Sequence, residues 1–115
     1  MATIFNTIKK VNGDPAIGVI VTLALVSDPD ESIPVRDDDD DFSVLGSSST
    51  ETDTDGYWEM DDLTPNDEIT PAGTLYKVTE RDVYSNEITY YVDVPDTATP
   101  TSFVGDILAT EPSWL

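Results

Sequence analysis

The chain contains no cysteine and no histidine, and these two absences remove several classes of protein. Disulfides, thiol catalysis and zinc sites with thiolate or imidazole ligands all need one of these side chains. A catalytic triad with a histidine base is excluded for the same reason. We therefore expect stability to come from packing alone.

Basic side chains are also scarce, because only five of the 115 residues are lysine or arginine, against 24 aspartates and glutamates. The basic residues are Lys9, Lys10, Arg36, Lys77 and Arg81. The formal net charge of −19 repels the phosphates of nucleic acids and the anionic headgroups of lipids. We therefore expect no nucleic acid and no membrane among the partners.

Long hydrophobic runs are missing as well. The longest run, 17–26, is interrupted by Gly18 and Thr22 and has about half of the roughly twenty residues that a membrane helix needs. Lys9 and Lys10 follow the first apolar residues rather than precede them, which is the reverse of a secretory leader. We expect neither a membrane span nor a classical leader in this sequence.

The chain nevertheless contains enough apolar material to fold. Hydrophobic residues make up 38% of the sequence and aromatic residues 9%, whereas disordered acidic chains are poor in aromatic residues. A mass of 12.6 kDa favours one core, so we expect one domain over 1–115 with an acidic loop insertion at 27–41. A surface so rich in carboxylates suits high salt, where counter-ions screen the repulsion, and we hypothesise a halophilic source.

Alternation of apolar and polar residues predicts strands, and no segment keeps a helical period for long. The predicted strands are 2–8, 18–26, 42–45, 50–54, 57–60, 74–81, 87–94 and 102–108. Turn signals such as Asn12-Gly13 and Asp55-Gly56 separate them. About seven or eight strands at this spacing predict an all-β chain folded as an antiparallel β-sandwich.

Two of these strands predict which side chains face the core. Residues 18–26 are apolar on both faces, with Thr22 as the polar exception, which predicts a central strand covered on both sides. Residues 87–94 alternate, and we expect the side chains of Ile88, Tyr90, Val92 and Val94 to point inward.

The acidic insertion is the first candidate for a binding function. Five consecutive carboxylates cannot lie in a core, and their repulsion favours an extended, hydrated loop. The sequence leaves three roles open for this segment, namely a solvated loop, a cation site and a surface for a basic partner. The candidate cation patch is Asp37, Asp38, Asp39, Asp40 and Asp41.

A second acidic segment, 51–62, superficially resembles a calcium-binding loop, with Gly56 at its sixth position. Glu51 stands where such a loop usually begins with aspartate, Asp62 stands where it ends with glutamate, and no helices are predicted beside it. We therefore interpret the segment as a hairpin closed at Asp55-Gly56. We expect no cofactor, with Ca²⁺ at the acidic loops as the alternative.

Aromatic residues are the remaining candidates for contact with partners. Most of them are expected in the core or in cross-strand pairs, and the others could form a face that stacks on sugars or docks on protein. An exposed tryptophan near the C-terminus would be unfavourable in water. Trp114 and Leu115 are therefore predicted to pack on their own domain or to dock on a partner.

Three segments resemble one family. Residues 52–58, T-D-T-D-G-Y-W, resemble the T-D-A-D-G-x-W/F hairpin of carboxypeptidase-regulatory-like, or prealbumin-like, β-sandwich modules. Residues 12–22 resemble their opening G-x-P-x-x-G-V-x-V-x. Residues 63–80 are similar to the stretch L-x-P-N-D-x-I-x-P-x-G-T-x-Y-x-V-T-E in the versions of this module found in tailed-virus virion proteins, including tail-fibre and head appendages. With 91–95 and 104–108, the resemblance covers about 2–109.

The resemblance implies an Ig-like or prealbumin-like sandwich without catalytic residues, so we expect no enzymatic activity. It implies a virion structural protein on the particle surface, and we favour a capsid decoration or head-appendage subunit present in many copies. The partners would be the major capsid protein or other virion proteins, together with further copies in a homo-oligomer, for which a trimer is one form. The alternative is a host-attachment or adhesin-type module, on a tail fibre or a cell surface, that recognises a glycan or a protein.

Overall fold

The computed structural model describes residues 2–28, 35–36, 42–44, 46–70, 72–95 and 101–114. These residues form strands and two short 3₁₀ turns, with no α-helix among them, so the all-β prediction is confirmed. The elements are β1 (Ala2–Thr7), β2 (Ile20–Val26), β3 (Val35–Arg36), β4 (Phe42–Ser43), β5 (Ser47–Glu51), β6 (Tyr57–Leu63), η1 (Asn66–Glu68), β7 (Ile69–Thr70), β8 (Leu75–Arg81), β9 (Glu87–Val92), β10 (Thr101–Phe103), η2 (Val104–Asp106) and β11 (Leu108–Ala109). Within the described ranges no helix is long and apolar enough to cross a membrane.

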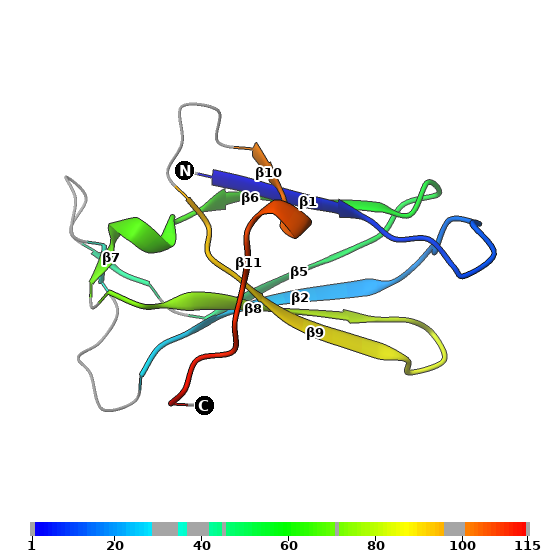
Figure 1. Cartoon of the computed structure of the whole chain (residues 1–115). Coiled ribbons are helices and arrows are strands. Elements are labelled where there is room, and N and C mark those ends of the chain that lie inside the picture. The colour runs from blue at the N-terminus through cyan, green and yellow to red at the C-terminus, as the bar shows by residue number, and fades with distance from the viewer. Residues whose placement is uncertain are drawn as a thin grey trace.

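Two main sheets lie one over the other in a sandwich-like arrangement (Figure 1). One sheet has three strands in the order β10-β1-β6, and the other has five in the order β11-β9-β8-β2-β5. Neighbouring strands are antiparallel except β1 and β10, which are parallel. A small third sheet, β4-β3-β7, contains a strand within the acidic insertion, while Asp37 to Asp41 lie outside the described residues.

The core lies between the two main sheets. Its fully buried side chains alternate along the strands with outward ones, as a period of two requires. The largest of them are Trp58, Ile4, Leu23, Val21, Val78, Val92 and Val94. Each such aliphatic side chain stabilises the fold by about 1.5 to 3 kcal/mol on burial, so the interface between the sheets supplies most of the hydrophobic stabilisation.

The central position predicted for 18–26 is confirmed, but the predicted cover over the outer face of β2 is absent from the described part of the chain. Val21 and Leu23 are buried, whereas Ile20, on the outer face, is 54% exposed. β2 is central within its sheet, between β8 and β5, yet only one side of that sheet has the second sheet against it. Apolar residues on both faces of a strand therefore did not mean burial on both faces.

The inward prediction for 87–94 holds for Val92 and Val94 and fails at its start. Val92 and Val94 are buried and Tyr90 is half-buried, but Ile88 is exposed. Ile88 lies opposite Glu80 in the register of β8 and β9. The three-stranded sheet is narrower than the five-stranded sheet, so it does not cover the first residues of β9.

The predicted hairpin over 50–60 is wrong in its pairing. The turn at 53–56 is present, but β5 pairs with β2 and β6 pairs with β1, so this connection joins the two sheets. The strand also begins earlier than predicted, because Ser47 and Ser49 pair with Ala24 and Thr22. Serines carry no apolar alternation, and an edge strand is held mainly by its backbone hydrogen bonds to one neighbour.

The predicted last strand, 102–108, is also wrong as a single element. The chain leaves the three-stranded sheet after β10, turns through η2 and enters the five-stranded sheet as β11. A Cβ at Gly105 would strike the ring of Phe103, so glycine lets the chain fold back beside that ring. The apolar pattern continues across this turn, which is why the sequence suggested one strand.

Candidate functional site

Three connections meet at one end of the molecule, namely 8–19, 53–56 and 82–86 (Figure 1). We call 8–19 and 82–86 together the loop end. One hydrogen bond fastens 8–19 to the turn 53–56, because the Ile8 amide donates to the Gly56 carbonyl at 2.7 Å. A second closes the connection on itself, because the Ala16 amide donates to the Ile8 carbonyl at 2.9 Å. The long connection between β1 and β2 is therefore held in one conformation by backbone contacts.

Thr52 holds the same connection in place by hydrogen bonds of its side chain and backbone. Its buried hydroxyl donates to the Ala16 carbonyl at 2.6 Å and accepts from the Val19 amide at 2.9 Å. The backbone amide of Thr52 donates in turn to the Val19 carbonyl at 3.0 Å. A side chain with both hydrogen-bonding capacities used in a buried site fixes the geometry around it, so 8–19 begins and ends on a rigid base.

Gly56 allows this close arrangement. Its φ of +75° is in the left-handed region, and a Cβ at this position would strike the Ile8 carbonyl oxygen. The sequence singled out Asp55-Gly56 as a turn signal, and the structure adds that the glycine also lets two backbones touch.

The second half of the loop end is closed by Asp82. Its carboxylate accepts hydrogen bonds from the Tyr84 amide at 2.9 Å, and from the amide and the side chain of Asn86 at 2.8 and 2.9 Å. These bonds, that from the Asn86 side chain first, hold the pKa of Asp82 below its ordinary value. Ser85 takes a φ of +66° within this turn. The turn is thus ordered by its own side chains.

Several apolar side chains of these two ordered connections are exposed to solvent. Tyr84 is 84% exposed and Val83 76%, and Val11 and Ile17 are also exposed. Between the two connections lies a hollow of about 380 Å³. It is lined by Lys10, Pro15, Ala16, Ile17, Val19, Asp82, Val83 and Tyr84. Exposed aliphatic and aromatic groups around a hollow are typical of a contact surface for another macromolecule.

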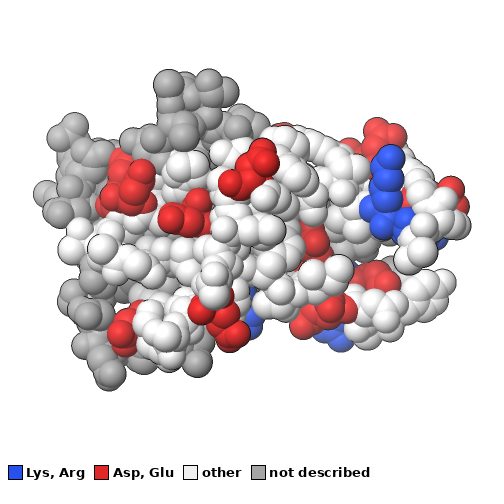
Figure 2. All heavy atoms as spheres, viewed as in Figure 1, with Lys and Arg blue, Asp and Glu red and all other residues white. Residues whose placement is uncertain are grey.

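The distribution of charge also sets the loop end apart. In Figure 2 acidic side chains are scattered over the face in view, whereas basic ones are seen at the loop end and along the lower margin, where Figure 1 places the five-stranded sheet. Lys9 and Lys10 belong to the connection 8–19. Asp14 and Asp82 balance these two lysines, so the loop end combines apolar groups with a net charge of zero in a chain whose net charge is −19.

One carboxylate is buried between the sheets, and no local sequence pattern distinguishes it from the exposed ones. Glu80 is only 7% exposed, and one of its oxygens accepts hydrogen bonds from Trp58 Nε1 at 2.8 Å, Asn6 Nδ2 at 3.0 Å and the Tyr90 hydroxyl at 3.1 Å. Burial, then the charge and hydrogen bond of Glu80, raises the pKa of Tyr90. Three neutral donors from both sheets satisfy this group, so it joins the sheets rather than forming a reactive centre.

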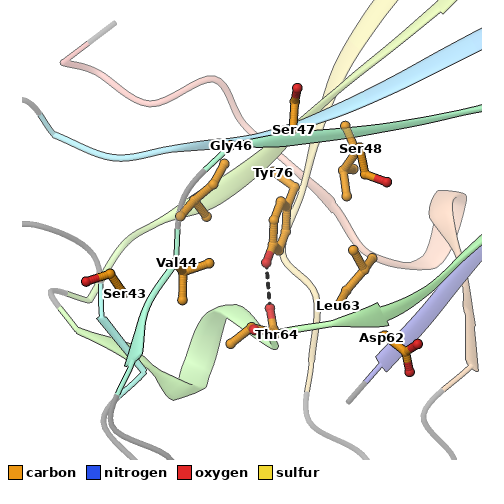
Figure 3. A pocket seen from close by; sticks show the side chains of 11 residues that line it. Ser43, Val44, Gly46, Ser47, Ser48, Asp62, Leu63, Thr64 and Tyr76 are labelled. Atoms are coloured by element: carbon orange, nitrogen blue, oxygen red, sulfur yellow. Dashed lines mark hydrogen bonds between the residues drawn. The ribbon is translucent and has the colours of Figure 1, made fainter.

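A second hollow, of about 270 Å³, opens between the sheets away from the loop end (Figure 3). Leu63 and Tyr76 lie in its wall, and the Tyr76 hydroxyl donates to the Thr64 carbonyl at 2.8 Å. Burial raises the pKa of Tyr76 to about 12. At the rim Asp62 has a φ of +60°, where the pairing of β1 and β6 slips its register. The Tyr76 hydroxyl is committed to the fold and is not free for a ligand.

None of the candidate site residues predicted from the sequence belongs to 8–19 or 82–86. Trp114 is half-buried, while Leu115 and the patch Asp37 to Asp41 lie outside the described residues. In the calcium-like segment, Asp53 accepts the amides of Asp55 and Tyr57 and so closes its own turn. Within the described ranges no three acidic side chains gather as metal ligands.

The exposed residues of the loop end were missed, although the sequence carried a signal for them. Val11 adjoins Asn12-Gly13, and Val83 and Tyr84 lie inside the turn 82–86. Large apolar residues within segments that are otherwise rich in turn-forming residues are the feature that would have identified this surface.

No family model matches the chain, and no curated protein matches it.

Proposed function

We propose that this chain is a non-enzymatic virion structural protein, a capsid decoration or head-appendage subunit of a tailed virus that docks in many copies on the particle surface through its loop end. The observation that carries the docking role is the cluster of exposed apolar side chains held on an ordered base at 8–19 and 82–86. The virion setting rests on the resemblance of 12–22, 52–58 and 63–80 to modules of such proteins, and the two facing sheets suit an Ig-like or prealbumin-like type.

Docking through the loop end has a simple energetic basis. Covering Val83, Tyr84, Val11 and Ile17 with a partner removes apolar surface from water, at about 25 cal/mol per Å². The hydrogen bonds of Asp82 and Thr52 already fix both connections, so little conformational entropy is lost on binding. The many carboxylates elsewhere keep particles apart in solution.

The rival function is a host-attachment or adhesin module. Aromatic side chains gathered at the loops would favour it, because sugars stack on such rings. Tyr84 is the one aromatic residue in the sequence of 8–19 and 82–86. Contact through aliphatic groups and one ring favours a protein partner, so we place docking on a virion protein ahead of glycan recognition.

Quantitative mass spectrometry of purified particles tests the proposal. We expect many copies per particle, comparable to the capsid protein. A few copies confined to the tail would favour the adhesin role, and absence from particles would refute both virion roles.

A matched pair of variants locates the docking surface. Tyr84→Asp adds a charge at the centre of the loop end, and we expect it to lower binding to depleted particles at least tenfold, or about 1.4 kcal/mol. Ala72→Asp adds the same charge at an exposed position outside the loop end and should bind as the native chain does. Equal binding by both variants would remove the loop end from the proposal.

A further inference from the structure

The outer face of the five-stranded sheet is the second unusual surface of the molecule. Its side chains come from alternate positions of β5, β2, β8 and β9, and the register places them in rows across the strands. The rows are Ser47, Ala24, Lys77 and Tyr91; then Ser49, Thr22, Thr79 and Thr89; then Glu51, Ile20, Arg81 and Glu87. We call this set the threonine face.

The threonine face has no net charge in a chain that carries −19. Its central strands β2 and β8 contribute no acidic residue to it, and the two acids, Glu51 and Glu87, lie on the strands that flank them. Lys77 and Arg81, both exposed, are two of the five basic residues of the chain. Because about a fifth of all residues are acidic, a face with two cations and no acidic residue on its central strands is matched to a negatively charged surface.

Apolar groups accompany the two cations. Ile20 is 54% exposed, and Leu75, which precedes Lys77 on the same face, is half-buried. Residues 18–26 have the composition of a strand that is covered on both faces. Among the described residues, nothing packs over its outer face. A flat face that combines exposed aliphatic groups and hydroxyls with balanced charges is what a sheet presents when another surface packs on it.

The outer face of the three-stranded sheet offers a matching surface. Phe5, Tyr57 and Phe103 form a row of rings there, with centroids of Phe5 6.1 Å from Tyr57 and 5.8 Å from Phe103. Glu59 lies opposite Phe5, Asp61 is the next outward residue of β6, and both are exposed. We call this set the aromatic face.

The carboxylates of the aromatic face are oriented but not neutralised. The Tyr57 hydroxyl donates to Glu59 at 3.0 Å, and the Thr3 hydroxyl donates to Asp61 at 3.1 Å. Among the described residues neither carboxylate forms an ion pair with a lysine or arginine of its own chain. Two oriented carboxylates beside three rings suit cations and the aliphatic groups next to them.

We propose that the threonine face of one copy packs on the aromatic face of the next copy. Lys77 and Arg81 meet Glu59 and Asp61, and Ile20 and Leu75 pack on the rings of Phe5 and Phe103. The two faces lie on opposite sides of the molecule, so the contact is head-to-tail and builds a row of copies rather than a closed pair (Figure 1). This contact goes beyond the proposed function, which needs only attachment through the loop end.

The size of the face sets the strength of the association. Four strands about 4.8 Å apart, with about seven residues of roughly 3.3 Å each, give a flat area of roughly 450 Å². A standard interface buries about 800 Å² of each partner, so one contact is weak. Copies concentrated on a surface would associate, whereas dilute copies would separate.

Zero-length cross-linking identifies the contact directly. Carbodiimide joins a lysine to a carboxylate only where the two touch, and Lys77 and Glu59 of one copy lie on opposite sides of the sandwich. We expect concentrated native protein to yield the cross-linked peptide pair Lys77 with Glu59 or Asp61, and to yield it only from dimers and larger species. Absence of this pair from cross-linked dimers would overturn the proposal.

Charge reversal tests the energetics by sedimentation up to millimolar protein at physiological ionic strength. We expect K77E/R81E and E59K/D61K each to weaken association at least tenfold. The combined variant keeps the native net charge and should recover to within about threefold of the native chain. Circular dichroism checks that every variant is folded.

Two further variants control for net charge. T54E/A72E/T110E/S113E changes the charge as K77E/R81E does, and D55K/E111K changes it as E59K/D61K does, at exposed positions outside both faces and outside the loop end. We expect each control to change association less than threefold. A native chain that stays monomeric, a combined variant that fails to recover, or controls as damaging as the reversals would each overturn the proposal.

Discussion

The two faces of the five-stranded sheet are built from alternate residues of the same strands, yet they meet opposite surroundings. On β2, Val21 and Leu23 are buried against the second sheet, while Ile20 is exposed and Thr22 and Ala24 are half-buried. The inner face holds the fold together. The outer face contributes little to that stability and is available for contact, so alternation along one strand separates folding from association.

The largest expected effect is on the inner face. Leu23→Ala leaves a cavity in the core, and we expect it to lower the free energy of unfolding by roughly 3 kcal/mol. Urea denaturation followed by tryptophan fluorescence measures this loss, because Trp58 is buried in the same core. A loss below about 1 kcal/mol would mean that the core can repack around Leu23.

The next effect concerns the buried carboxylate of the inner face. Glu80→Ala removes the acceptor of the Trp58, Asn6 and Tyr90 donors, and we expect a loss of about 2 kcal/mol in unfolding free energy. Glu80→Gln keeps an acceptor oxygen and should lose less. Thr79→Ala, at the neighbouring outward position of β8, is the matched control and should change stability by less than about 0.5 kcal/mol.

A smaller effect is expected where the loop end meets the sandwich. Gly56→Ala combines an unfavourable positive φ with a clash against the Ile8 carbonyl, and we expect it to cost about 1.5 kcal/mol and to disturb 8–19. Gly13→Ala also meets a positive φ, of +91°, but its Cβ enters open space. It should cost about 1 kcal/mol and leave 8–19 in place. Amide hydrogen exchange of 8–19 distinguishes the two variants.

The smallest effect on stability is expected on the outer face. Ile20→Thr keeps a β-branched residue in β2, and we expect the free energy of unfolding to stay within about 0.5 kcal/mol of native. The same variant should weaken self-association measured by sedimentation, because it removes apolar contact from the threonine face. A loss of stability as large as that of Leu23→Ala would mean that the outer face is also part of the core.

Much of the fold follows from local pattern, and the failures have identifiable causes. Alternation correctly predicted that Val92 and Val94 point inward, because successive side chains of a strand point to opposite faces of its sheet. It could not predict which sheet a strand joins. The serines of β5 carry no apolar signal, and the pattern of 102–108 runs unbroken through a change of sheet.

The candidate site was less predictable than the fold. The acidic patch Asp37 to Asp41 and the tail residues Trp114 and Leu115 drew attention because of composition, whereas the loop end consists of ordinary valines, an isoleucine and a tyrosine. Their significance comes from two connections, distant in sequence, that lie at one end of the sandwich. Such proximity depends on topology, and one sequence read locally does not contain it.

The parallel pairing of β1 with β10 also constrains how the molecule folds. Thr3 pairs with Thr101 and Phe5 with Phe103, so the strand near the start of the chain finds one neighbour only after almost all of the sequence is available. During synthesis from the N-terminus the antiparallel pair of β1 and β6 can form first, with one edge of β1 unpaired. Closing so long a loop is slow, and a nascent chain would expose that edge until β10 arrives.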